Sequence, residues 1–176
     1  ICWRQRRYPM TQDITSNAAH PDSRIGHVHL KVSNLDQAIA FYSGVLGFEL
    51  QVRMGDQAAF LGAGGYHHHI GLNTWESAGA GPAPKFAAGL YHTAFLFPTR
   101  KDLALVIKRV TDAGLSFTGA ADHGVSEAIY LDDPDGNGVE LYVDRPKADW
   151  PTDENGKIIM YNKPFDLKGV MAELDT

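Results

Sequence analysis

Hydrophobic and polar residues alternate along the segment IGHVHLKV. Val28, Leu30 and Val32 fall on one side of the strand that this pattern predicts, and His27 and His29 fall on the other. We expect the aliphatic side to pack against a helix, because a helical pattern follows at once. The two histidines then face away from that helix, into whatever cavity the sheet forms.

The next segment, NLDQAIAFYSGVLGFEL, predicts a helix and a second strand, with Asn34 as the residue that caps the helix N-terminus. The segment GLYHTAFLFPTRKDLALVIKRVTDAGLSFT repeats this plan. His92 takes the place of His27, 65 residues later, and Thr99 takes the place of Asn34. This internal repeat predicts two copies of one βαβββ module.

We therefore predict an α+β fold, in which two tandem βαβββ modules form an open, metal-centred, barrel-like sheet with helices outside. The first module is expected at 23–76, a linker rich in Gly, Ala and Pro at 77–88, and the second module at 89–145. A flexible segment (1–22) and a C-terminal arm with a short helix (146–176) flank this single compact domain. The concave face of the sheet is where we expect the functional site.

The other strands are predicted from short apolar or alternating runs bounded by turn residues. They are expected at residues 48–53, 58–61, 66–74, 115–118, 125–131 and 139–143. Asp166 is expected to cap the short helix of the arm.

Composition excludes several classes of function. The chain has 44% hydrophobic and 21% charged residues, a net charge of −5 and a pI near 5.9, so it offers no basic field for nucleic acid or for an anionic membrane. No apolar run is long enough for a transmembrane span, and the N-terminal residues lack the apolar core of a signal peptide. The single cysteine, Cys2, fits a reducing compartment, and we predict a cytoplasmic protein.

Two histidines and a glutamate are candidate metal ligands. His27 and His92 occupy equivalent places in the repeat, and Glu140 alternates onto the concave face of the last predicted strand. Two histidines and one carboxylate from separate strands make the set that suits non-haem Fe(II) and leaves coordination positions open. A carboxylate in such a cavity is costly to bury without a cation.

Histidines 67–69 form a second cluster. His68 takes the place in the first module that Glu140 takes in the second, so it is either a fourth ligand or an acid/base beside the metal. His29, beside His27 on the cavity face, is expected either to line the cavity or to support a metal ligand from behind. The alternative for at least two members of this triplet is an ordinary solvated histidine.

His123 and Tyr130 flank the segment HGVSEAIYL, and Tyr130 could donate a hydrogen bond to an oxygen in the site. The alternative for Tyr130 is the packing of a half-buried tyrosine. The following segment, DDPDGNG, lacks the ligand spacing of an EF-hand loop and is predicted to be a tight turn.

The chain resembles the vicinal oxygen chelate superfamily, which includes glyoxalase I, fosfomycin-resistance proteins, bleomycin-binding proteins and extradiol dioxygenases. The resemblance covers residues 25–144 and rests on GHVHLKVSNLDQAIAFYSGVLGFEL and DDPDGNGVELY. GYHHHIGLNTW, GLYHTAFLFPTRKDLA and ADHGVSEAIYLDDPDGNGVELY are similar to the catechol 2,3-dioxygenase branch.

That resemblance implies an extradiol dioxygenase that opens a catechol-type ring with O₂, and a homodimer. It implies that His27, His92 and Glu140 hold Fe(II), with Mn(II) or another divalent metal as alternatives. His68 would match the histidine that handles protons, and His123 and Tyr130 the pair that contacts the substrate. The alternatives are a glyoxalase-like isomerase or thiol transferase, and a protein that binds a small aromatic compound without chemistry.

Overall fold

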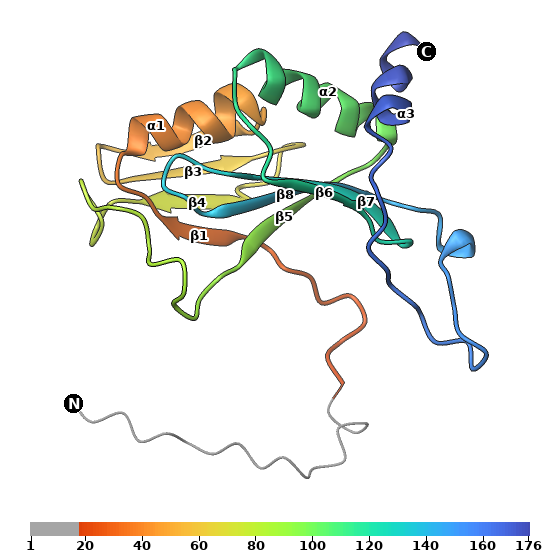
Figure 1. Ribbon diagram of the computed structural model, residues 1–176. Helices are drawn as coiled ribbons and strands as arrows, with labels where there is room; N and C mark the ends of the chain where they lie inside the picture. Colours follow the sequence, from red (N-terminus) through yellow and green to blue (C-terminus); the bar gives the residue numbers. More distant parts are fainter. Residues whose placement is uncertain (1–17) are drawn as a thin grey trace.

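The computed structural model describes residues 18–176 and shows two four-stranded sheets with helices along one side (Figure 1). Cys2 and most of the expected N-terminal segment 1–22 lie within residues 1–17, which are outside the described residues. The first module contains β1 (Val28–Lys31), α1 (Leu35–Ile39), η2 (Ala40–Val45), β2 (Glu49–Met54), β3 (Ala58–Gly62) and β4 (Ile70–Asn73). The second contains β5 (His92–Phe97), α2 (Arg100–Asp112), β6 (Gly119–Asp122), β7 (Ser126–Asp132) and β8 (Gly138–Asp144). The C-terminal arm contains η3 (Lys147–Asp149), α3 (Leu167–Ala172) and η4 (Glu173–Asp175).

The two sheets have the same topology. Their strand orders are β1-β4-β3-β2 and β5-β8-β7-β6, and in each the first strand pairs in parallel with the last while the other pairs are antiparallel. Neither sheet closes into a barrel. The predicted repeat and the predicted α+β class are therefore confirmed.

Capping side chains fix where the helices begin. Asn34 accepts a hydrogen bond from the backbone N–H of Gln37, and Thr99 accepts one from that of Asp102. Asp166 does the same for α3 through the N–H of Gly169. Each bond satisfies one of the amides that a helix start leaves free. All three predicted caps are confirmed.

The buried core lies between the helices and the sheets and is continuous across both modules. Its members are the helix-facing residues of the strands and the inward stripes of the helices, which alternate as the sequence pattern predicted. They include Leu30, Val32, Leu35, Ala38, Tyr42, Leu61, Ile70, Leu72, Leu103, Val106, Ile107, Val110, Leu131, Val139, Leu141 and Val143. One shared core makes the two modules a single packing unit.

The modules also meet at close backbone contacts. The guanidinium of Arg109 on α2 donates a hydrogen bond to the carbonyl oxygen of Leu46 at 3.1 Å. A Cβ at Gly47 would lie 2.4 Å from a nitrogen of that guanidinium, and Gly47 has φ +89°. Glycine is needed here for both reasons, because other residues rarely adopt this φ and a side chain would push Arg109 away.

Three predicted strands differ from the observed ones by more than two residues at a boundary. β1 starts at Val28, one residue after His27, and β4 starts at Ile70, after the histidine triplet. β6 covers 119–122 instead of 115–118, because its pairing with β7 begins at Gly119, opposite Tyr130. No helix among residues 18–176 is long and apolar enough to cross a membrane.

Candidate metal and catalytic site

The second module places three predicted site residues on one face of its sheet. Tyr130 on β7 lies directly opposite Glu140 on β8, and His92 at the start of β5 pairs with Gly138. Gly138 and Glu140 project to the same side because they are two residues apart along a strand. The three side chains therefore share the face that points away from the helices.

These residues and His123 form a hydrogen-bonded set, which we call the second-module cluster. His92 Nε2 lies 2.9 Å from Glu140 Oε2, and the Tyr130 hydroxyl donates to Glu140 Oε1 at 3.0 Å. His123 Nε2 lies 2.8 Å from the Tyr130 hydroxyl oxygen. The Glu140 side chain keeps only 12% of its exposure. Burial, and after it the charge of Glu140, raises the pKa of Tyr130 well above its ordinary value, so its hydroxyl stays protonated.

The spacing of His92 and Glu140 fits a pair of neighbouring metal ligands. Two ligand atoms, each about 2.1 Å from an ion and 90° apart, lie about 3 Å from each other, close to the 2.9 Å observed between Nε2 and Oε2. The donor types, imidazole and carboxylate, also suit a divalent first-row metal. His92 Nδ1 is buried without a hydrogen-bond partner among the described residues.

The first module carries a second group on the sheet face that points away from the helices, which we call the first-module cluster. The rings of His27 and His68 lie 4.5 Å apart, and Phe60 lies 5.1 Å from His68. His29 stands between Phe60 and Trp75, with ring separations of 5.8 Å and 5.5 Å. The cluster is a wall of aromatic and imidazole rings, which suits the flat face of an aromatic molecule.

Sequence explains how this wall forms. His29 pairs across the ladder with Gly71 on β4, and a Cβ at Gly71 would lie 2.9 Å from the His29 ring. The glycine therefore gives the ring its space. Burial, and after it the charge of His27, lowers the pKa of His29, and burial followed by the neighbouring histidines lowers that of His68. Both imidazoles are therefore more often neutral at pH 7, the form that binds metals and accepts protons.

The structure brings each cluster together but does not join the two. Within residues 18–176, no group of three or more His, Cys, Asp and Glu side chains is arranged to hold a metal ion. His92 and Glu140 fit a metal in chemistry and spacing, and His27 is not placed beside them. The three-ligand set stays a prediction.

Sequence reasoning missed one contact of this site. His123 Nδ1 lies 3.1 Å from the backbone carbonyl oxygen of Tyr161, 38 residues further along the chain. No side-chain pattern signals a contact made by a carbonyl group, so only the path of the C-terminal arm reveals it.

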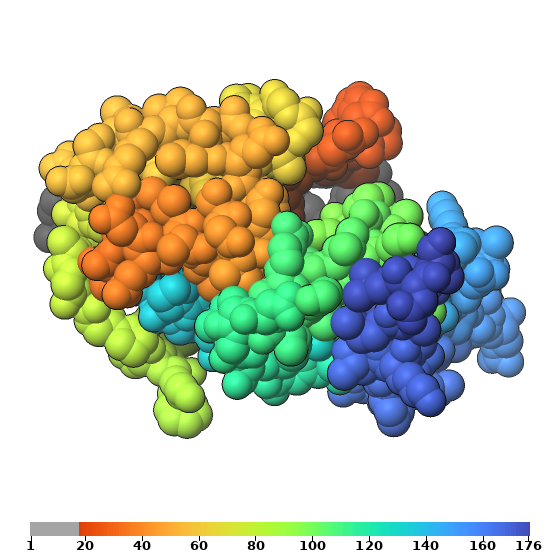
Figure 2. Space-filling view, turned by 90° about the horizontal axis from the view of Figure 1, so that it is seen from above, coloured from red at the N-terminus to blue at the C-terminus, as the bar shows by residue number. Residues whose placement is uncertain are grey.

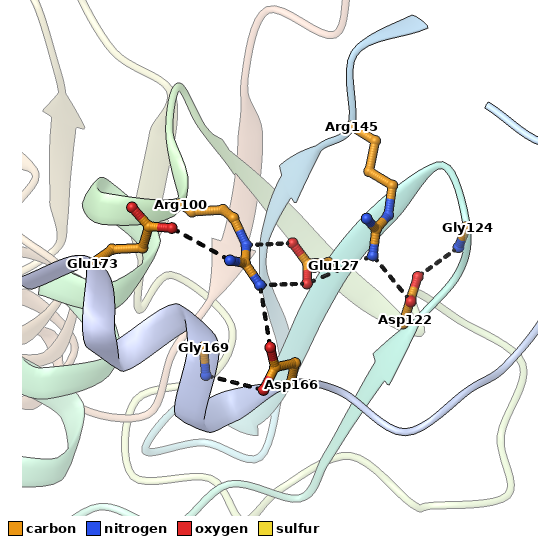
Figure 3. A network of polar contacts seen from close by, with 8 residues as sticks. All are labelled: Arg100, Asp122, Gly124, Glu127, Arg145, Asp166, Gly169 and Glu173. Carbon is orange, nitrogen blue, oxygen red and sulfur yellow. Dashed lines mark hydrogen bonds and ion pairs between the residues drawn. The ribbon is translucent and has the colours of Figure 1, made fainter. Parts of the chain in front are cut away.

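A separate pocket of about 550 Å³ lies on the helix side of the second module. Its charged side chains, among them Arg100, Glu127 and Arg145, pair with one another (Figure 3). Glu127 is three residues from Tyr130 on β7 and so faces the opposite side of the sheet. This pocket is distinct from both clusters.

Comparison with known proteins agrees with the fold. The Glyoxalase/Bleomycin resistance protein/Dioxygenase superfamily model matches residues 24–141. A catechol-2,3-dioxygenase of Bacillus subtilis is 38% identical over 88% of this chain and 53% of its own length. Biphenyl-2,3-diol 1,2-dioxygenase 3 of Rhodococcus globerulus is 34% identical over 69% of this chain and 63% of its own. The matched region is thus about half to two thirds of the length of these relatives.

A solved structure gives the same result for the fold. The glyoxylase/bleomycin resistance protein/dioxygenase domain from Frankia sp. EAN1pec is 27% identical, with a TM-score of 0.58 over 70% of this chain and 98% of that domain. The repeat, the two matching sheets and these comparisons lead to one conclusion. The chain belongs to the Glyoxalase/Bleomycin resistance protein/Dioxygenase superfamily.

Proposed function

We propose that this protein is a metal-dependent extradiol dioxygenase, which uses O₂ to open the ring of a catechol-type substrate. The hydrogen-bonded second-module cluster carries the proposal, because it combines two metal-type donors with a protonated phenol on one sheet face. Two relatives are named as dioxygenases of a catechol and of a biphenyl diol. Their names support the aromatic diol as the substrate class.

His27, His92 and Glu140 are the residues that would hold the metal, with Fe(II) as the proposed ion. When bound, such an ion supplies Lewis-acid and one-electron redox chemistry. His92 and Glu140 already stand at the spacing of neighbouring ligands. His27 would complete the set from the first module, and a homodimer is the proposed assembly.

The chain's own residues would bind the diol and handle its protons. The rings of Phe60, His29 and Trp75 offer an aromatic wall for the substrate. His68 is biased toward the neutral form by its lowered pKa, so it can accept a proton from a hydroxyl group. Tyr130 stays protonated and can donate a hydrogen bond to a substrate oxygen.

Oxygen uptake tests this proposal. The protein is reconstituted anaerobically with Fe(II), given a panel of catechols, and followed for O₂ consumption and a yellow ring-opened product. We expect about one O₂ per catechol consumed. His92→Ala removes a proposed ligand. It should abolish turnover and lower the bound iron to well below one ion per chain. His20→Ala, a change at an exposed histidine that pairs with Asp22, should leave both unchanged.

His68→Ala separates its acid/base role from metal binding. We expect iron to be retained and kcat to fall by about 10²- to 10⁴-fold, the usual contribution of a positioned acid or base. Undiminished turnover in this variant would exclude the role given to His68. Failure of the wild-type protein to consume O₂ with iron bound would favour the isomerase or transferase, and failure to bind metal at all would favour the binding protein.

A further inference from the structure

The central part of the C-terminal arm, residues 151–166, returns to the second module beside His123. Asp122 and Lys163 exchange two backbone hydrogen bonds, each 2.9 Å long. The N–H of Tyr161 also donates to the carbonyl oxygen of His123 at 3.2 Å. The arm therefore pairs in antiparallel fashion with Asp122, the last residue of β6, directly beside His123.

The arm is fixed at both of its ends. Near its start, Trp150 Nε1 donates to the carbonyl oxygen of Arg145 at 2.8 Å. At its far end, the guanidinium of Arg100 lies 3.8 Å from Asp166 and 3.3 Å from Glu173 (Figure 3). The bond from Tyr161 N–H to His123 and the Asp122–Lys163 pairing then hold the carbonyl of Tyr161 in place relative to the sheet.

The position of that carbonyl decides which nitrogen of His123 carries hydrogen. A carbonyl oxygen can only accept, and it lies 3.1 Å from His123 Nδ1, so Nδ1 must be the donor. In the opposite neutral tautomer, two acceptors would face each other at this distance. In the neutral ring, Nε2 is then a bare acceptor, and it lies 2.8 Å from the hydroxyl oxygen of Tyr130.

We propose that Tyr161, through its backbone carbonyl, is a positioning residue that fixes His123 in the Nδ1–H tautomer and so directs the Tyr130 hydroxyl. That hydroxyl has one hydrogen, which it donates either to Glu140 Oε1 at 3.0 Å or to His123 Nε2 at 2.8 Å, and not to both at once. The phenol is thereby held between the two. The effect on catalysis rests on the proposed function, whereas the tautomer itself does not.

Gly124 offers a way to move the arm without touching the site. It has φ +82°, and a Cβ there would lie 2.7 Å from two ring atoms of Tyr161 and 2.9 Å from Pro151. Gly124→Ala should therefore displace the arm from His123. Gly156→Ala is the matched control, because Gly156 has φ +74° in the arm with open space around its Cβ position. Both substitutions place alanine at a positive φ and should lower stability by a similar amount. We expect only Gly124→Ala to move Tyr161, because only there would the new Cβ meet its ring.

The test is nitrogen NMR of the histidine rings in the metal-free protein of residues 1–176, with His123→Gln to assign the signal. We expect His123 to be Nδ1–H in the wild type and in Gly156→Ala, and to lose that single tautomer in Gly124→Ala. Lys163→Pro, which removes the N–H that Asp122 accepts, provides a second displacement if Gly124→Ala does not fold. An Nε2–H signal in the wild type, or an unchanged tautomer in both displaced variants, would overturn the proposal.

Kinetics of the iron-loaded protein then connect the tautomer to turnover. We expect Gly124→Ala to lower kcat by at least about 10-fold, a loss within the range for a misplaced proton-transfer group, with KM little changed, while Gly156→Ala matches the wild type. An equal loss in both variants would contradict the positioning role. Absence of ring cleavage in the wild type would contradict the proposed function and leave the tautomer result standing.

Discussion

Tyr42 is a buried side chain whose hydroxyl joins the two modules. It donates a hydrogen bond of 2.9 Å to Asp133, in the turn between β7 and β8. Asp133 also accepts from the backbone of Asp135 and from the backbone and side chain of Asn137. The predicted acidic turn is thus held together by its own buried carboxylate. Because Ser33 N–H donates to Asp135 as well, the turn is fixed to the first module at two points.

Removing the Tyr42 hydroxyl should lower the free energy of unfolding and change how that free energy depends on pH above about 10. We expect Tyr42→Phe to lower the free energy of unfolding by about 1.5–3 kcal/mol, the usual value of a hydrogen bond to a charged group. Burial, followed by the charge of Asp133, raises the pKa of Tyr42 above its ordinary range. The unfolded tyrosine ionises near pH 10 while the folded one does not. Stability therefore falls as pH rises above 10.

Urea titrations between pH 8 and 11 measure this effect. The wild type should lose stability with rising pH more steeply than Tyr42→Phe, because the variant lacks the group that releases a proton on unfolding. Tyr91→Phe, which changes an exposed tyrosine, is the control and should keep the wild-type slope. Parallel slopes for the wild type and Tyr42→Phe would contradict the argument.

Helices were the elements that sequence predicted best. Asn34 and Thr99 are residue types with a strong capping preference, and each sits directly before an amphipathic run, so local chemistry determines the helix start. The buried stripe of α2 followed from the same local spacing. Helix boundaries depend on residues close in sequence, which is why the pattern was sufficient.

Strand boundaries depend on a distant partner and were predicted less well. The alternation that contains His27 continues before β1, but the ladder with β4 begins only where Val28 meets Ile70. β6 is made of small residues with little intrinsic strand preference, and its pairing with β7 decides its position. The same limit applies to the site, where sequence identified His123 and could not identify the Tyr161 carbonyl that contacts it.

The Thr99 cap is a testable case of local control. Its hydroxyl oxygen accepts from the N–H of Asp102 at 3.1 Å. Thr99→Ala should lower the free energy of unfolding by about 1 kcal/mol, because it leaves a helix-start amide without this partner. Thr111→Ala, in the last turn of the same helix, is the control. Its hydroxyl only donates back to the Ile107 carbonyl, so its loss should change stability by a few tenths of a kcal/mol.

Thermal or urea unfolding of both variants provides the measurement. A loss in Thr111→Ala equal to that in Thr99→Ala would show that the threonine side chain matters for another reason than capping.

On the scale of the whole molecule, the two modules are held by one core and by contacts at their junction. Phe95 of β5 lies 4.9 Å from Phe48 and 6.4 Å from Tyr42 of the first module, measured between ring centroids. Viewed from the helix side, the turn between β7 and β8 emerges between α1 and α2, and α3 packs beside α2 (Figure 2). Residues of the two clusters therefore depend on packing that both modules and the arm provide.

The ion-pair network that fixes α3 is centred on a buried carboxylate. Glu127 keeps 5% of its side-chain exposure and accepts two hydrogen bonds from Arg100, of 2.7 Å and 2.9 Å (Figure 3). Arg145 lies 3.6 Å from the same carboxylate. Arg100 also reaches Glu173, and so links the start of α2 to the C-terminal helix.

Arg100→Ala should therefore destabilise the whole molecule. Breaking a buried ion pair costs about 3–5 kcal/mol, because the remaining charge stays uncompensated. Here we expect the lower end, about 3 kcal/mol, because the Arg100 side chain is one-third exposed and Arg145 still lies beside Glu127. Lys108→Ala on the same helix breaks an exposed pair with Asp112 and should cost less than about 0.5 kcal/mol. At about 2–4 °C per kcal/mol for a chain of this size, Arg100→Ala should lower Tm by roughly 6–12 °C. A loss no larger than that of Lys108→Ala would mean that Glu127 finds water or another partner, and that the arm is not held by this network.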